Sequence, residues 1–241
     1  DPGPPIIVFD YQTGRAGHHA RKFLNGWKGH LVVDDYGGYK KLFDGDVVEV
    51  GCWAHARRKF FDLQAANQSL MAVEALRRIG LLYEIEARGR FMSVHERQAL
   101  RQAESVPVLE SLHEWLQEQA RILAPNGGSA KAVAYTLRRW PALRLYADSG
   151  NLPIDNNPVE NSIRPIALGK KNWLFAGSER AGRRAAAIQS LLGTAKLNGI
   201  EPLAWLTGVL EKLPNWKNHR LEELLPLKKE TTDQKEDSQA R

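Results

Sequence analysis

Residues 31–51 read LVVDDYGGYKKLFDGDVVEVG and contain a strand–helix–strand pattern. Short apolar, mostly β-branched runs at 31–33 and 47–50 predict two strands. Residues 39–43 between them predict a short helix that ends at an Asp-Gly-Asp turn. A strand, a helix and a strand in succession favour an α/β fold with at least one parallel pair of strands.

The segments on either side extend this pattern. The run Ile-Ile-Val-Phe at 6–9 predicts a further buried strand, and residues 18–27 predict a short helix. From 54 to about 147, apolar residues recur three and four positions apart and no strand is predicted. We interpret this stretch as a helical subdomain inserted between strand-bearing segments.

A second helical part follows the inserted block. Asn-Asn-Pro at 156–158 predicts the start of a helix that Pro165 kinks or ends. The stretch 169–182 reads as a loop, and helices are predicted at 183–197 and 202–213.

Composition sets limits on the class of protein. The 241 residues are 43% hydrophobic and 26% charged, which is typical of a folded domain rather than a disordered chain. Cys52 is the single cysteine, so no internal disulfide can form, and no apolar run reaches the ~20 residues of a spanning helix. We expect a cytoplasmic protein with no membrane partner, a disordered tail at 228–241, and a chain cut from a longer one because no initiator Met is present.

The net charge of +6 is concentrated in the folded part of the chain. Between 164 and 184, only Glu179 opposes a group of basic residues, and Trp173 lies among them. A second basic run lies at 57–59. Such runs fit DNA phosphates, although a solvated helix face is the alternative. The candidate DNA-binding residues are Arg57, Arg58, Lys59, Arg164, Lys170, Lys171, Trp173, Arg180, Arg183 and Arg184.

Two carboxylates have positions that suit catalysis. Asp34 directly follows a predicted strand, where ligands of open α/β sheets gather, but it could also cap the next turn. Asp35 would point elsewhere if the strand continued. Glu160 lies three residues after Asn157, which is also the spacing of a helix capping box.

Cys52 and His55 have zinc-like spacing without a second pair of ligands nearby, so a zinc site is weakly supported.

Four strings of this sequence together resemble the IS66 family of insertion-sequence transposases. They are VDDYGGY (33–39), GCWAHARRKF (51–60), DNNPVENSIRPIALGKKNWLFAGS (155–178) and AAAIQSLLGTAKLNG (185–199). The likeness extends from about residue 7 to 226.

The resemblance implies a ribonuclease-H-like fold with a mixed sheet, a large all-helical insertion and a helical C-terminal part. Residues 1–54 and 151–200 would form the catalytic core, incomplete at its N-terminus, 55–150 the insertion, and 201–227 a C-terminal helical segment.

The resemblance also implies a DDE active site, in which three carboxylates hold two Mg²⁺ or Mn²⁺ ions. Asp34 matches the second carboxylate and Glu160 the third, so we expect their carboxylates within about 8 Å of each other. Cys52 and His55 would shape the site rather than bind zinc.

Three positions depart from the family pattern. Asp35 stands where Gly is common, and Asn161 stands where Arg often follows the Glu. The first catalytic Asp of the family lies upstream of Ile7, and Asp10 is only an outside candidate to replace it.

The function expected from the resemblance is Mg²⁺-dependent DNA cleavage and strand transfer at the ends of a bacterial element. The partners would be element-end and target DNA, further copies of the protein on that DNA, and an upstream part of the same protein. One alternative is a truncated, inactive transposase that only binds DNA, and another is a helical protein-interaction module.

Overall fold

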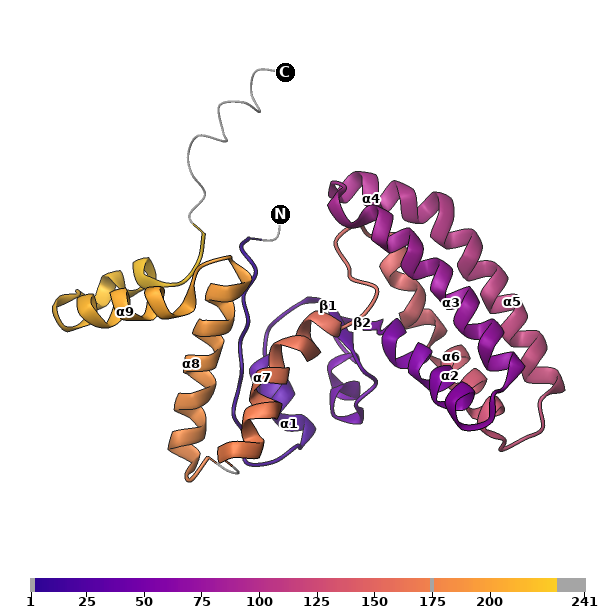
Figure 1. The fold of residues 1–241 in the computed structure, drawn as a ribbon, viewed down its shortest axis with the longest axis horizontal. Coiled ribbons are helices and arrows are strands. Elements are labelled where there is room, and N and C mark those ends of the chain that lie inside the picture. Colours follow the sequence, from indigo (N-terminus) through magenta and orange to yellow (C-terminus); the bar gives the residue numbers. More distant parts are fainter. Residues whose placement is uncertain (1–2, 174–175, 229–241) are drawn as a thin grey trace, which may run out of the picture. The chain divides into compact units, whose positions relative to one another are not determined.

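The computed structural model describes residues 3–173 and 176–228, with the side chains of Lys170 and Trp173 left aside. The chain divides into a central unit, Ala16–Asn161, and a terminal unit formed by Asp1–Arg15 with Ser162–Arg241. Figure 1 traces both along the sequence. Most of the disordered tail predicted at 228–241 lies outside the described residues.

The central unit begins with the strand–helix–strand pattern predicted from residues 31–51. Helix α1 (Gly17–Phe23) leads into strand β1 (Gly29–Val33), a 3₁₀ helix (Gly37–Leu42) and strand β2 (Val47–Gly51). The two strands pair in parallel, with Val33 opposite Gly51. The predicted parallel pair is confirmed.

The sheet is held against the helices by its second strand. Val47 and Val50 are buried and Val48 is exposed. Because side chains alternate across a strand, Val47 and Val50 point to opposite faces, so part of each face of β2 is covered. A Cβ atom at Gly51 would lie 3.0 Å from the side chain of Leu143. The glycine therefore allows the strand to approach helix α6 closely.

The helical block occupies the rest of the central unit. It contains α2 (Trp53–Asn67), α3 (Leu70–Arg88), α4 (Val94–Leu100), α5 (Val106–Ile122) and α6 (Gly128–Arg144), with short 3₁₀ or π turns at Gly89–Phe91, Arg101–Ser105 and Leu145–Asp148. No residue between 54 and 147 is in a strand, which confirms the prediction from periodicity. Pro107 lies in the first turn of α5, directly after the π turn at Arg101–Ser105.

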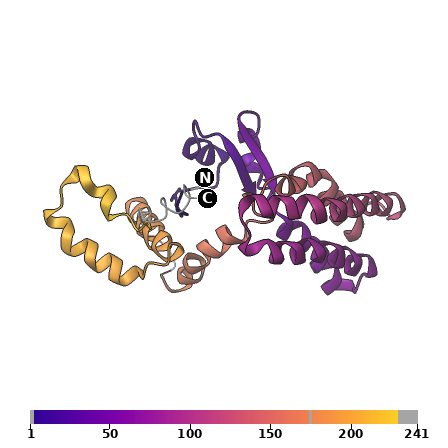
Figure 2. The same ribbon diagram turned by 90° about the horizontal axis from the view of Figure 1, so that it is seen from above.

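Four of these helices surround the core. Helix α3 packs against α2 and α5, and α6 packs against the same two helices, so the four form a closed bundle (Figure 2). Trp53 is completely buried, meets Trp140 edge to face with ring centroids 5.7 Å apart, and donates from Nε1 to the Leu143 carbonyl at 2.9 Å. The indole thus joins the start of α2 to α6 without leaving its polar atom unpaired.

A buried ion pair supports the far end of the bundle. Arg101 is 2% exposed and contacts both carboxylate oxygens of Glu86, at 2.8 and 2.6 Å. It also donates to the carbonyls of Tyr146 and Leu152. A buried guanidinium with this many acceptors is well satisfied, because both its charge and its N–H groups find partners.

The terminal unit contains an extended segment that packs along a helix. The strand predicted at 6–9 is wrong: the segment is extended but has no strand neighbour in the described part of the chain. Side chains of helix α8 (Glu179–Leu197) take the place of a strand, because the amides of Ile7 and Phe9 donate to Thr194 Oγ1 and Ser190 Oγ at 3.0 and 2.7 Å.

Small residues let the segment approach α8. A Cβ atom added at Gly182 would lie 2.6 Å from the ring of Tyr11, and one at Gly193 would lie 3.3 Å from Ile7. Together with Ser190 they form a narrow track for the extended backbone.

Helix α7 (Asn157–Trp173) begins in the central unit and continues into the terminal one. Of the two effects predicted for Pro165, the end of the helix is wrong, because Pro165 lies inside α7. A single proline removes one backbone hydrogen bond, and the turns on both sides of it persist. The loop predicted at 169–182 is also wrong, since α7 reaches Trp173 and α8 begins at Glu179. Ser178 caps α8 by accepting from the Ala181 amide at 3.1 Å.

The C-terminal part is helical, as predicted. Helix α9 (Pro202–Lys212) is followed by 3₁₀ turns at Leu213–Asn215 and Asn218–Leu224. None of the described helices has the length and apolar character needed to cross a membrane.

The described residues are thus mostly helical, and their sheet has two parallel strands. The expected boundaries at residues 54 and 150 do not coincide with the two compact units. The division into a catalytic core and an insertion stays a prediction.

Candidate functional site

Asp34 lies at the carboxyl end of the sheet. It directly follows Val33, the last residue of β1, which pairs with Gly51 at the end of β2. Its side chain is exposed, and Oδ1 accepts the backbone N–H of Tyr36 at 3.1 Å. One carboxylate oxygen of Asp34 therefore caps the next turn, as the alternative predicted.

The segment that leads into α7 is fastened to the end of the neighbouring strand. Cys52, the residue after β2, donates from Sγ to Asn156 Oδ1 at 2.9 Å, and the Asn156 amide points back to the sulfur at 3.4 Å. The Trp53 amide donates to the Ile154 carbonyl at 3.1 Å. Parallel strands are about 4.8 Å apart, so these bonds bring the start of α7 to the sheet edge that carries Asp34.

Glu160 lies in the first turn of α7 and faces a histidine. Its Oε1 is 3.4 Å from His55 Nε2, and its side chain is 45% exposed. The other ring nitrogen, Nδ1, is 3.2 Å from Cys52 Sγ. Cys52, His55 and Glu160 therefore form one row of contacts that joins the end of β2 to the first turn of α7.

The capping-box alternative for Glu160 is wrong. Asn157 is already the first helical residue, and its amide donates to Asp155 Oδ1 at 3.1 Å. The Glu160 side chain is therefore not needed to satisfy that amide.

The thiol of Cys52 is buried and not bound to another sulfur. Burial is the main cause that raises the pKa of Cys52, which favours the neutral thiol over the thiolate that zinc requires. Among the described residues, no group of three or more His, Cys, Asp or Glu side chains could hold a metal ion.

Asp35 points into a cluster of charged side chains. It pairs with Lys40 at 2.7 Å and with Arg139 at 3.2 Å, and Arg139 also binds Glu49. Burial opposes ionisation of Asp35, but the hydrogen bond from Lys40 and the nearby arginines outweigh it, so the pKa of Asp35 is lowered. Its φ of 75° is in the left-handed region, which explains physically why a glycine suits this position.

Sequence reasoning missed the buried carboxylate beside the site. Asp155 is 7% exposed and accepts from the Tyr83 hydroxyl at 2.9 Å and from the amide and side chain of Asn157 at 3.1 and 2.8 Å. Burial and the Asp155 charge raise the pKa of Tyr83, which keeps the phenol protonated as a donor. The Asp-Asn-Asn string was visible, but Tyr83 lies 72 residues earlier and gave no signal.

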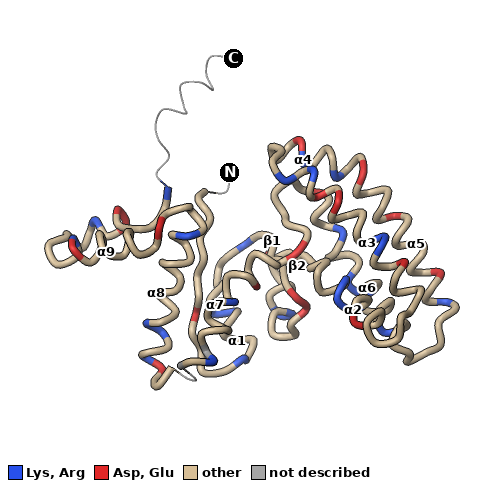
Figure 3. The backbone as a smooth tube through the Cα atoms, in the orientation of Figure 1, with Lys and Arg blue, Asp and Glu red and all other residues tan. Residues whose placement is uncertain are grey.

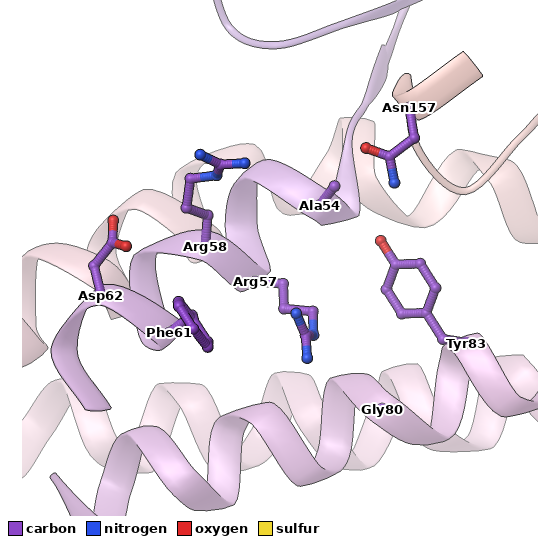
Figure 4. A pocket seen from close by; sticks show the side chains of 8 residues that line it. All are labelled: Ala54, Arg57, Arg58, Phe61, Asp62, Gly80, Tyr83 and Asn157. Carbon is purple, nitrogen blue, oxygen red and sulfur yellow. The ribbon is translucent and has the colours of Figure 1, made fainter. Parts of the chain in front are cut away.

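A pocket of about 640 Å³ opens between α2, α3 and the first residue of α7 (Figure 4). It is lined by Ala54, Arg57, Arg58, Phe61, Asp62, Gly80, Tyr83 and Asn157. Figure 4 shows Arg57 and Phe61 projecting from α2 toward α3, with Tyr83 pointing toward Asn157.

The candidate DNA-binding residues fall into two groups, one in each unit. In the central unit Arg57, Arg58 and Lys59 are exposed on α2, and basic residues on α2 and α8 are visible in Figure 3. In the terminal unit the exposed members are Arg164, Lys171, Arg180, Arg183 and Arg184. Arg183 pairs with Glu179 at 2.5 Å, which offsets its charge, and the side chains of Lys170 and Trp173 lie outside the described part.

Asp10 belongs to the terminal unit. It follows the extended segment rather than a strand, which removes the structural reason for naming it as a candidate. Its Oδ2 accepts from the Gln12 side chain at 2.6 Å. Its catalytic role and that of Asp34 and Glu160 stay predictions.

Comparison with known proteins gives a consistent result. A family model described as "Transposase IS66 family" matches residues 1–184, and one described as "IS66 C-terminal element" matches 190–227. The uncharacterized protein y4hP of Sinorhizobium fredii is 35% identical over 240 residues, which cover 92% of this chain and 44% of that protein. The uncharacterized protein y4qI of the same bacterium is 34% identical over 232 residues, which cover 92% and 43%. The chain thus spans less than half the length of these relatives, and no solved structure matches it.

Proposed function

This chain belongs to the IS66 family of transposases, and we propose that it supplies two carboxylates of an active site that cuts and joins DNA strands. The observation that carries the proposal is the shared sheet edge. Asp34 follows β1, and the hydrogen bonds from Cys52 and Trp53 bring the first turn of α7, with Glu160, to the end of the adjacent strand.

The proposed cofactor is a pair of Mg²⁺ or Mn²⁺ ions. Carboxylate oxygens suit these ions, and Asp34 and Glu160 are both accessible to solvent. The fit is partial, since the described residues contain no group of three potential ligands. A third carboxylate has to come from elsewhere in the protein. Bound divalent ions would neutralise charge at the scissile phosphate.

The residues of this chain would orient the reacting groups. His55 Nε2 lies 3.4 Å from Glu160 Oε1, and the contact of Nδ1 with the Cys52 sulfur at 3.2 Å orients the ring. Cys52 and His55 thus act as positioning residues for the carboxylate. Arg57 and Lys59, exposed further along α2, would contact backbone phosphates, so affinity should fall steeply with salt.

The test is Mg²⁺-dependent cleavage of DNA that carries the element ends, by the gene product at its full encoded length. We expect Glu160→Gln to lower cleavage at least 100-fold without weakening DNA binding, because it keeps the side-chain shape and removes the charge. Glu110→Gln, at an exposed position of α5, is the matched control and should cleave normally. Undiminished cleavage by Glu160→Gln would refute the catalytic assignment.

A second candidate is a protein that binds DNA without cutting it. It is favoured by the lack of a three-ligand group in the described residues. It predicts DNA binding with no metal-dependent cleavage by either variant or by the unmodified protein. Self-association on element ends is part of both proposals and would appear as slower-migrating complexes.

A further inference from the structure

The pocket between α2 and α3 has the volume and the lining of a ligand site. Its volume of about 640 Å³ falls within the ~300–1,000 Å³ typical of pockets that take small organic groups. Its walls combine guanidinium groups, aromatic rings and the side-chain amide of Asn157 (Figure 4).

Gly80 keeps the pocket open. It lies in the middle of the 19-residue helix α3, where glycine is destabilising relative to alanine. A Cβ atom added there would meet no atom within 4 Å, so packing does not demand the glycine. A glycine that lowers helix stability and is not required by packing is explained if another molecule occupies the space beside it.

The lining of the pocket carries a net positive charge, because the guanidinium groups of Arg57 and Arg58 face one carboxylate, that of Asp62. Arg77 and Arg78, in the preceding turn of α3, are both paired with Glu74, at 2.7 and 2.6 Å. No ion pair joins Arg57 or Arg58 to a carboxylate in the described part of the chain. The two exposed guanidinium groups are therefore available to an anion.

An aromatic wall accompanies these charges. Phe61 is 51% exposed, and its ring projects into the same space as Arg57 (Figure 4). An aromatic face beside basic residues is how proteins hold single-stranded nucleic acid, with the base stacked on the ring and the phosphate on the cations.

We propose that this pocket holds one unpaired nucleotide of a DNA strand. The base stacks on Phe61 above Gly80, and the adjoining phosphate contacts Arg57 and Arg58. Asn157 lines the pocket three residues before Glu160, about 4.5 Å along α7, so the held nucleotide lies beside the proposed catalytic carboxylate. The inference rests on the proposed function for the identity of the strand as DNA.

The test is metal-free binding of a fluorescent oligonucleotide, measured by anisotropy with the whole 241-residue chain. Three probes are used: a mixed-sequence single strand, the same strand in a duplex, and a free nucleoside monophosphate. Gly80→Leu fills the pocket and should weaken single-strand binding about ten-fold, the loss expected for one stacked base, while duplex binding changes less than two-fold. Gly80→Ala adds only a methyl group and should weaken single-strand binding less than Gly80→Leu does, and urea unfolding of both variants checks that they fold.

Two charge variants complete the design. Arg57→Gln should weaken binding of both the single strand and the duplex, whereas Arg77→Gln, whose charge is already paired, should weaken neither. Unchanged single-strand binding by Gly80→Leu, or monophosphate binding as tight as that of the strand, would overturn the inference. Because the binding assay contains no metal, its result does not depend on cleavage. If the unmodified protein bound the single strand as expected but failed to cleave DNA in the Mg²⁺ assay, only the proposed function would be refuted.

Discussion

Asp155 offers the sharpest test of how the start of α7 is held. Asp155→Ala removes the acceptor of three hydrogen bonds, from the Tyr83 hydroxyl and from the amide and side chain of Asn157. Hydrogen bonds to a charged group contribute about 1.5–3 kcal/mol each, which would sum to about 5–9 kcal/mol. Asn157 is exposed, so water replaces its two bonds, and we expect a loss of about 2–3 kcal/mol that comes mainly from Tyr83.

Urea unfolding followed by tryptophan fluorescence measures this loss, because Trp53 and Trp140 lie in the core of the same unit. The control is Asp44→Ala, which removes an exposed carboxylate and should change the free energy of unfolding by less than about 0.5 kcal/mol. Tyr83→Phe should account for most of the Asp155→Ala loss. If Asp155→Ala were no more destabilising than Asp44→Ala, the hydrogen bonds would not be what holds α7.

Two further predictions concern charge. The lowered pKa of Asp35 means that its ion pairs stabilise the fold above its unfolded pKa of 3.8 and lose that effect as the pH falls through the lower folded value. The matched variant is Asp35→Asn, because asparagine tolerates the same positive φ. The free energy of unfolding of this variant should differ from that of the unmodified chain by a constant amount near neutral pH, and the difference should shrink in acid. A difference that does not depend on pH would show that charge is not involved. Replacing Lys170 and Lys171 with Ala should weaken binding to unrelated DNA sequences about equally and flatten its salt dependence, whereas Lys131→Ala should not; a loss confined to one sequence would indicate base readout instead.

Periodicity was enough to predict the elements whose burial is local. The parallel strands around residues 31–51 and the strand-free helical block both follow from the spacing of apolar residues. The strand at 6–9 could not be distinguished in this way, because an apolar run is equally suited to a sheet and to the side of a helix. The segment packs on helix α8 because Ser190 and Thr194, more than 180 positions away in the sequence, accept hydrogen bonds from its backbone amides.

The site was predictable only in part. Motif strings identified Asp34, Glu160, Cys52 and His55, and the structure joins the last three through contacts of 3.2 and 3.4 Å. The role of Asp155 depends on Tyr83, a partner that only the packing of α3 brings near. Tertiary contacts of this kind leave no periodic or local signal in a sequence.

The narrow track on α8 limits how this region can evolve. Any side chain larger than hydrogen at Gly182 would collide with the ring of Tyr11, and a bulkier residue in place of Ser190 would displace the backbone that it binds. Substitutions there are tolerated only if the extended segment changes with them. The opposite, exposed face of α8, with Arg184 and Ile188, has no such packing constraint. In divergent copies of the gene, the two ends of this chain should therefore change together although more than 170 residues separate them.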